Sequence, residues 1–219
     1  MARRGMALLV LGLLGAGPAW PQGTAPGDLA LPAPRTSGGR PLMDVLRDRH
    51  SVREFSAQEI PAQVLSDLLW AACGVNRPGD GKRTAPSAHN WQELDVYAVL
   101  ATGAYRYDAR AHRLVSVAQG DLRPLAGTQP FVATAPLNLV YVADTARMAG
   151  ASPEDQALYL GADTGFVGQN VYLFCASEGL ATVVRASVDR APLARALGLG
   201  PQHRVVLAQT VGYPATPSR

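Results

Sequence analysis

The chain has 219 residues, a formal net charge of +3, 47% apolar residues and 17% charged residues. This length is sufficient for one globular domain with a substantial core. The sequence contains no basic stripe that would release counterions from phosphates, so we expect no nucleic-acid partner. Lys82 is the only lysine and lies in a Gly-rich loop, which argues against a mechanism through a Schiff base.

The first residues have the pattern of a targeting signal. Arg3 and Arg4 precede an apolar run at residues 6–14, and small residues follow at 17–19. We therefore expect a signal peptide at residues 1–19 and export, in a bacterial cell to the periplasm, with a twin-arginine signal as an alternative. The run is too short for a permanent membrane span. Cleavage would remove two positive charges and leave a net charge of about +1.

Residues 20–40 are rich in proline and glycine, which predicts a flexible lead to a single domain at residues 41–219. Cys73 and Cys175 both fall within apolar helical patterns. They are predicted to be buried thiols rather than the two halves of a disulfide.

Apolar periodicity and turn residues predict the elements along the domain. Leu42, Val45 and Leu46 have helical spacing, and Pro61 and Gly74 bound a second helix. The remaining predictions are a loop at 79–87, a strand at 94–100, a hairpin of 105–107 with 114–117, a central strand at 136–143, the longest helix at 153–178, a strand at 181–185, a helix at 192–197 and a strand at 205–213. This order predicts a layered α+β domain.

Four small residues lie along the longest predicted helix. They are Gly161, Ala162, Gly165 and Gly168. Small side chains let another backbone approach closely, so this helix face is predicted to serve either core packing or a dimer interface.

One polar cluster stands out between the first two helices. The run Arg49-His50-Ser51-Val52-Arg53 offers two guanidiniums and a hydroxyl, which are typical donors to a phosphate group. The alternative is a solvated helix end whose arginines complement the helix dipole. The sequence lacks a Gly-x-Ser-x-Gly elbow, a Gly-x-Gly-x-x-Gly turn and any Cys or His pair at metal-ligand spacing. We therefore expect no metal.

Four motifs in order resemble the nitroreductase family. They are Arg49-His50-Ser51-x-Arg53, Pro86-Ser87-x-x-Asn90-x-Gln92, Gln169-Asn170 in a helix ending in Glu178-Gly179-Leu180, and Val211-Gly212-Tyr213-Pro214. The short chain and the hairpin at 105–117 are similar to the branch of azoline-oxidising dehydrogenases. The resemblance implies an α+β nitroreductase-like fold with a central, mainly antiparallel sheet flanked by helices. It also implies an obligate homodimer with one FMN at each of two interface sites.

The resemblance also implies roles for particular positions. Phosphate and ribityl contacts fall on Arg49, His50 and Ser51, and Arg53 matches the basic residue beside flavin N1 and O2. The segment that the partner subunit lays against the ring matches Pro86, Ser87 and Ala88, with Asn90 and Gln92 close behind. The turn whose backbone N–H approaches flavin N5 matches Val184, Arg185 and Ala186. The chain departs from the family at Ala186-Ser187, which replaces Glu-Gly, and at Ala215, where many members carry a basic phosphate ligand; Arg219 is the candidate substitute.

The expected function is that of an FMN-dependent oxidoreductase. Hydride would pass through flavin N5 to or from a small conjugated substrate such as a nitroaromatic or a quinone, with no catalytic side chain. The expected electron donor is NAD(P)H or, if the protein is exported, a quinol or a redox protein. Two alternatives stay open. Arg53 could instead form a structural ion pair with Glu54 or Glu59, and the protein could be a flavin-binding carrier or sensor without turnover.

Overall fold

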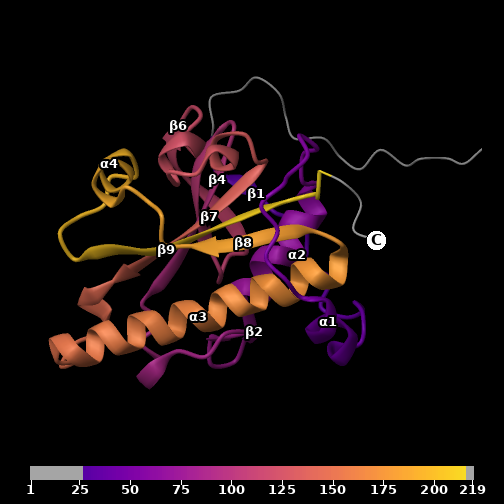
Figure 1. Ribbon diagram of the computed structural model, residues 1–219. Helices are drawn as coiled ribbons and strands as arrows, with labels where there is room; N and C mark the ends of the chain where they lie inside the picture. The colour runs from indigo at the N-terminus through magenta and orange to yellow at the C-terminus, as the bar shows by residue number, and fades with distance from the viewer. Residues whose placement is uncertain (1–26, 216–219) are drawn as a thin grey trace, which may run out of the picture.

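The computed structural model describes residues 27–215. The expected signal peptide and Arg219 lie outside these residues. The described chain is built around a seven-stranded sheet with the strand order β1-β6-β5-β4-β7-β9-β8, and every pairing in it is antiparallel. Figure 1 shows this sheet with the long helix α3 crossing one side of it. The α+β architecture predicted from the sequence is confirmed.

The strands and helices mostly follow the predicted order. The strands of the main sheet are β1 (Leu29–Ala30), β4 (Leu94–Leu100), β5 (Gly103–Asp108), β6 (Arg113–Gln119), β7 (Leu137–Asp144), β8 (Ala181–Arg185) and β9 (His203–Gly212). The helices are α1 (Leu42–Asp48), α2 (Ala62–Cys73), α3 (Pro153–Glu178) and α4 (Arg190–Ala196). Short 3-10 turns occur at Ala88–Asn90, Arg123–Leu125, Pro130–Ala133 and Thr145–Arg147.

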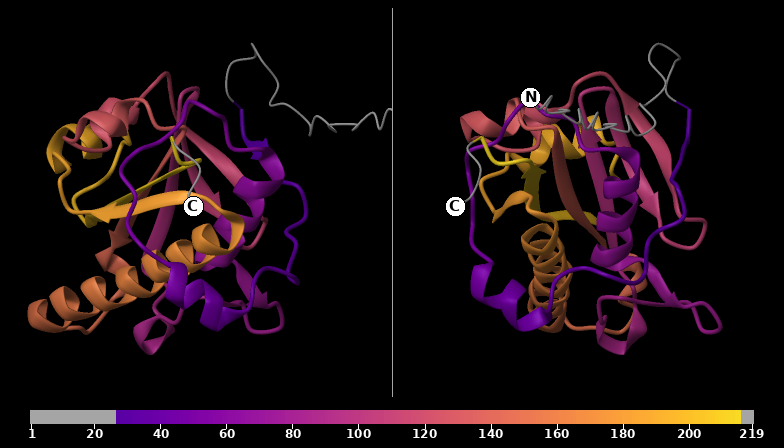
Figure 2. Two further views of the ribbon diagram at one scale, coloured as in Figure 1. Left: turned by 45° about the vertical axis from the view of Figure 1, so that its right-hand side comes forward. Right: turned by 90° about the vertical axis from the view of Figure 1, so that its right-hand side faces the viewer.

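Apolar side chains fill both faces of the sheet, because successive residues of a strand point to opposite sides. One layer joins the sheet to α2 and α3 and includes Leu68, Val171 and Tyr141. The other layer joins it to α4 and the 3-10 turns and includes Val140 and Leu193. Figures 1 and 2 show α4 on the opposite side of the molecule from α1 and α2.

Helix α3 is the element that positions the candidate site. Ser152 caps its N-terminus, since its hydroxyl oxygen accepts a hydrogen bond from the Asp155 amide at 3.1 Å. Gly179 ends the helix in the left-handed conformation, with φ of 70°, as its place after Glu178 suggests. The helix contacts α1, α2, β8 and β9, so groups on different sides of it are held at fixed separations.

Two segments differ from the sequence-based expectation. Residues 79–87 were expected to be a loop, but they contribute β3 (Lys82–Arg83), which pairs with β2 (Val75–Arg77). Residues 20–40 were expected to be a flexible lead, yet the part from residue 27 onward is attached to the domain. Strand β1 pairs with β6, and Arg35 forms a 2.7 Å ion pair with the buried carboxylate of Asp67.

Both cysteines are free thiols buried in the core, as predicted. Burial raises the pKa of Cys73 to about 11 and raises the pKa of Cys175 further. Neither thiol is therefore a reactive nucleophile at neutral pH.

Candidate flavin site

The segment 49–53 leaves α1 in an extended conformation and runs beside β8. Arg49 is the C-cap residue of α1, with φ of −60° and ψ of 120°. The Val52 amide donates to the carbonyl of Thr182 at 2.9 Å. Arg49 and Ser51 both approach Tyr172 of α3, and Arg53, two residues further along, is exposed. His50 and Val52 line a hollow of about 660 Å³, which Tyr172 also lines.

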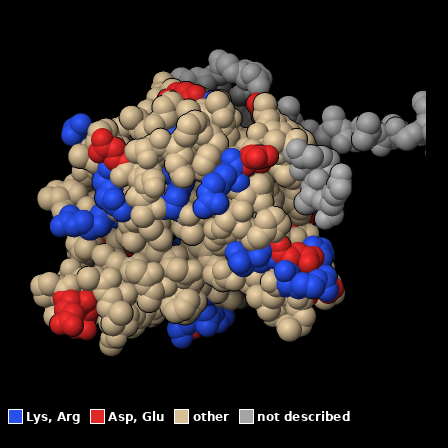
Figure 3. All heavy atoms as spheres, in the orientation of Figure 1, with Lys and Arg blue, Asp and Glu red and all other residues tan. Residues whose placement is uncertain are grey.

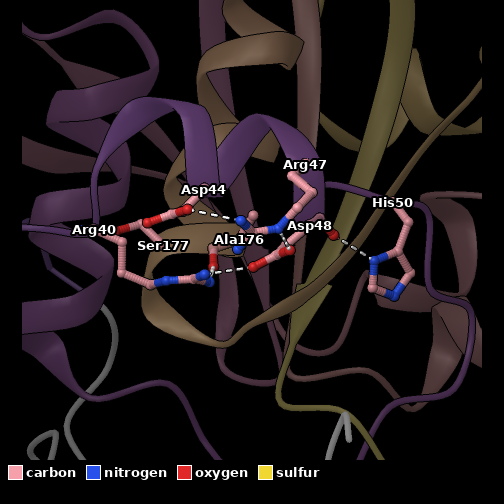
Figure 4. A network of polar contacts seen from close by, with 7 residues as sticks. All are labelled: Arg40, Asp44, Arg47, Asp48, His50, Ala176 and Ser177. Carbon is pink, nitrogen blue, oxygen red and sulfur yellow. Dashed lines mark hydrogen bonds and ion pairs between the residues drawn. The ribbon is translucent and has the colours of Figure 1, made fainter.

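A network of polar contacts fixes the start of this segment (Figure 4). Arg40 pairs with Asp48 and also donates to the carbonyl of Ala176 at 3.2 Å, so it ties α1 to the C-terminal end of α3. The hydrogen bonds from Arg40 and Arg47 lower the pKa of Asp48. The Asp48 carbonyl lies 2.7 Å from Nδ1 of His50, which holds that ring away from Arg49 and Ser51.

Tyr172 of α3 connects the segment to β8. Its hydroxyl accepts a hydrogen bond from the Val184 amide at 2.9 Å and lies 2.8 Å from the hydroxyl oxygen of Ser51. The Arg49 guanidinium carbon lies 5.2 Å from the centre of the Tyr172 ring, a cation–π distance. Sequence reasoning missed Tyr172, although it follows the Gln169-Asn170 motif by two residues.

Arg49 and Arg53 form no ion pair within residues 27–215. The alternative partners considered for Arg53, Glu54 and Glu59, therefore do not neutralise it in the described chain. Two guanidiniums without a carboxylate, separated by a serine hydroxyl, form a donor set suited to an anionic ligand. Arg53 and Ser51 are exposed, so one subunit presents this face open rather than as a closed pocket.

The turn after β8 completes this side of the site. The Val184 amide is already bonded to Tyr172, but the Ala186 amide donates to no group in the described part of the chain. Ala186 is exposed, and its own carbonyl accepts from the Val188 amide at 2.8 Å. A free N–H on an exposed residue suits a ligand with an acceptor at its edge.

The second motif is held on another part of the molecule. The Ser87 hydroxyl donates to a carboxylate oxygen of Glu93 at 3.0 Å, and the Ala88 amide donates to Asp163 at 2.9 Å. Burial and the neighbouring Asp163 raise the pKa of Glu93, which favours the protonated form of Glu93. Pro86 and Asn90 are exposed on this segment. Glu93 and Asp163 were not singled out from the sequence.

Backbone strain and aromatic contacts also mark this segment. His89, Asn90 and Gln92 all have positive φ, at 50°, 56° and 49°. The rings of His89 and Trp91 lie 4.6 Å apart, and both approach Tyr159 of α3. The side chain of Gln92 braces the turn from within, because it donates to Asn90 at 3.0 Å and to the carbonyl of Gly81 at 3.2 Å.

The two motifs do not meet within one chain. Asp163 holds the second motif and Tyr172 holds the first, and the two residues are separated by nine positions of α3. Nine positions correspond to two and a half turns and about 13 Å of rise, so their side chains leave opposite sides of the helix. Within the described chain, Tyr172 therefore links Ser51 to Val184, while residues 86–90 are held at another part of α3.

A metal-ligand cluster or a membrane-spanning helix would indicate another class of protein. Residues 27–215 contain no group of three or more His, Cys, Asp or Glu side chains that could hold a metal ion. In the same range, no helix is long and apolar enough to cross a membrane. The face drawn in Figure 3 carries small, separated groups of both charges rather than a continuous basic stripe.

Comparison with known proteins identifies the family. The family model described as "Nitroreductase family" matches residues 46–213. A protein of Methanocaldococcus jannaschii named as a nitroreductase is 34% identical over 152 residues, which cover 65% of this chain and 76% of that protein. The chain belongs to the nitroreductase family, whose members are flavin-dependent oxidoreductases.

Solved structures agree with this assignment. A crystal structure from Ralstonia eutropha, also named as a nitroreductase, is 43% identical, with a TM-score of 0.84 over 94% of this chain and 97% of that one. The NADPH:FMN oxidoreductase from Vibrio harveyi in complex with NAD+ shares the fold at 22% identity. Its TM-score is 0.57 over 80% of this chain and 70% of that one. The protein is thus an oxidoreductase of nitroreductase type.

Proposed function

We propose that the protein is a homodimeric FMN-dependent oxidoreductase that binds one flavin on each face formed by residues 49–53 and 184–186. The observation that carries this proposal is the pair of guanidiniums at Arg49 and Arg53, which no carboxylate of residues 27–215 neutralises. The Vibrio harveyi protein of the same fold is named for its action on FMN, which favours FMN over FAD.

The residues fit distinct parts of FMN. The Arg49 guanidinium, held over the ring of Tyr172, supplies a fixed cation for the phosphate, and the Ser51 hydroxyl supplies a neighbouring donor. Arg53 supplies a cation for the N1–C2=O edge, and the unbonded Ala186 amide supplies a donor for N5. His50 faces the adjacent hollow, so its expected phosphate contact would require the ring to turn from its bond to Asp48.

When bound, FMN supplies the hydride chemistry at N5, and the protein supplies orientation and charge. The partner subunit's copy of the 86–88 segment would cover the ring edge and exclude water. A small conjugated substrate, such as a nitroaromatic or a quinone, would then stack on the remaining open face. NADPH is the expected donor by likeness to the Vibrio harveyi protein; an exported protein would instead draw electrons from a quinol or a redox protein.

Purified protein tests the proposal directly. Mass spectrometry of the released cofactor should give FMN, and steady-state assays should show reduction of a nitroaromatic or a quinone with NADPH, NADH or a quinol. FAD in place of FMN, or a colourless protein that FMN cannot reconstitute, would refute the cofactor assignment. Stoichiometric FMN without turnover by any donor would favour the carrier or sensor instead.

Variants of the two site arginines separate binding from redox tuning. Arg49→Ala should weaken FMN retention with little change in the potential of the flavin that remains. Arg53→Ala should lower the midpoint potential by an amount on the order of tens of millivolts, because it removes a cation that favours the reduced ring. Spectroelectrochemical titration measures both, with Arg195→Ala, an exposed arginine on α4, as the matched control. An unchanged midpoint potential in Arg53→Ala would show that Arg53 does not lie beside flavin N1.

A further inference from the structure

The side chain of Arg185 is a buried cation on the far face of β8. Its exposed fraction is 6%, and it points to the α4 side of the sheet together with Asn138 and Thr210. Its guanidinium donates to Thr210 Oγ1 at 3.1 Å, to the Ala126 carbonyl at 2.6 Å and to Asn138 Oδ1 at 2.8 Å. All three acceptors are neutral.

No carboxylate of the described chain forms an ion pair with this guanidinium. Burial lowers the pKa of Arg185 to about 10, which still leaves the group charged at neutral pH. An unpaired charge in the interior is strongly destabilising unless something offsets it. Stability of the fold alone therefore gives no reason for a full charge here, since a neutral donor could serve the same acceptors.

The surroundings of the guanidinium are shaped to keep it in one orientation. A Cβ atom added to Gly127 would lie 2.0 Å from Nη1 of Arg185, so only glycine permits this approach. The Asn138 amide oxygen also accepts from the Thr210 hydroxyl at 2.7 Å, and the Asn138 amide nitrogen donates to the Val132 carbonyl at 2.9 Å. The cation is thus fixed in position and enclosed.

The other face of the same strand belongs to the candidate flavin site. Val184 faces α3, and its amide is bonded to Tyr172, while the free Ala186 amide follows directly after Arg185. A ligand lying on residues 184–186 would therefore have the Arg185 charge behind the strand, with protein rather than water between them. Charges separated by protein interact more strongly than charges separated by water.

We propose that Arg185 is a fixed cation that favours the reduced flavin electrostatically, without touching it. This inference depends on the proposed FMN site. Two electrons and one proton convert oxidised FMN into a reduced form with one net negative charge on the ring, and that charge attracts the buried guanidinium. Arg185 would then have two separate effects: its hydrogen bonds stabilise residues 126–138, and its charge sets the flavin potential.

Three variants separate charge from hydrogen bonding. Arg185→Met removes the charge and the donors, Arg185→Lys keeps the charge but loses the fork of donors, and Asn138→Asp places a carboxylate beside the intact guanidinium. Arg185→Met and Asn138→Asp should each lower the preference for reduced over oxidised FMN about tenfold, which is roughly 30 mV for a two-electron couple. Arg185→Lys should keep the preference of the parent protein.

The measurement is a spectroelectrochemical titration of each FMN-loaded protein, with urea unfolding in parallel. Arg190→Met is the matched control, because Arg190 also donates to two main-chain carbonyls, at 2.9 and 3.1 Å, but lies at the surface. Its potential should equal that of the parent.

The outcomes distinguish this inference from the proposed function. The inference would be overturned if the midpoint potential followed hydrogen bonding rather than charge. In that case the potential would fall in Arg185→Lys and Arg185→Met but stay unchanged in Asn138→Asp. Equal potentials in all variants would also overturn it. Both results would leave FMN binding and turnover in the parent intact. A parent protein that binds no FMN would refute the proposed function and this inference together. If Arg185→Met fails to fold, Asn138→Asp and Arg185→Lys still decide the question.

Discussion

At the scale of single residues, Tyr172 joins the parts of the proposed site that are far apart in the sequence. Its hydroxyl bridges the Val184 amide and the Ser51 hydroxyl, and its ring lies under Arg49. A tyrosine in this position sets the distance between the cations and the turn after β8. The arginines alone would not define a site, because long exposed side chains adopt many conformations.

Removing this one hydroxyl should loosen the proposed site. In Tyr172→Phe, the Val184 amide and Ser51 lose their shared partner, which should lower the free energy of unfolding by about 1 kcal/mol and weaken FMN binding. Urea unfolding and calorimetric FMN titration measure the two effects. Tyr159→Phe is the control, since the Tyr159 hydroxyl bonds to no described residue. In a double-mutant cycle with Ser51→Ala, strictly additive losses would contradict a coupling through this hydroxyl.

At the scale of elements, α3 separates the two motifs and presents apolar surface. Leu158 is 63% exposed and Phe166 is 45% exposed on this helix. Gly161 and Gly165 are also exposed, and a Cβ added to either would meet no atom within 4 Å. Gly168 differs, because it is buried and its added Cβ would lie 3.4 Å from Gln209. Of the small residues along α3, Gly168 therefore packs in the core, whereas Gly161 and Gly165 face open space.

Gly165→Leu tests whether a second subunit covers this helix. The single chain has room for the added side chain, so the subunit's own fold should persist, and the larger residue also favours the helix. If a partner lies here, dimer content should fall by more than half, with a matching loss of FMN. Sedimentation velocity and absorbance measure the two quantities. Gly79→Leu, at another open position, should change neither. A stable FMN-loaded monomer in the parent protein would contradict the dimer.

The elements that the sequence predicted well are those with a clear apolar period. Helix α2 has leucines at helical spacing between Pro61 and Gly74, and α3 has both a serine cap and a terminal glycine. The β2–β3 hairpin was missed because strands of three and two residues show no period. The burial of Arg185 without an acidic partner could not be predicted either. The sequence does not state which face of a strand a side chain occupies or whether a carboxylate lies nearby.

At the scale of the whole molecule, the N-terminal part of the described chain acts as a strap across the domain. Residues 27–40 contact β6 through Leu29 and α2 through Arg35, and they reach the C-terminal end of α3 through Arg40. Because Arg40 also holds α1, the strap supports the start of the 49–53 segment (Figure 4). The sequence predicted flexibility here from proline and glycine content, but the attachments are polar and distant in sequence, so no local pattern reveals them.

His112 clamps this strap to the domain and should make its stability depend on pH. Nε2 lies 2.7 Å from the Ser66 hydroxyl and 3.1 Å from the Pro32 carbonyl, and Nδ1 lies 2.8 Å from the Tyr107 hydroxyl. Burial lowers the pKa of His112 below its usual value of 6.5, although the Pro32 carbonyl and Asp67 partly oppose this shift. The folded chain therefore favours the neutral ring more than the unfolded chain does.

The sign of the effect follows from this difference in pKa. The unfolded chain binds a proton at His112 more readily, so the contribution of this residue is fully present above about pH 6.5 and is lost as the pH falls toward its lowered folded value. Urea midpoints of the parent should consequently decrease between pH 8 and pH 5, and His112→Gln should flatten that decrease. His203→Gln, which replaces a partly exposed histidine at the start of β9, should retain it. An equal slope in the parent and in His112→Gln would show that His112 does not carry the pH dependence.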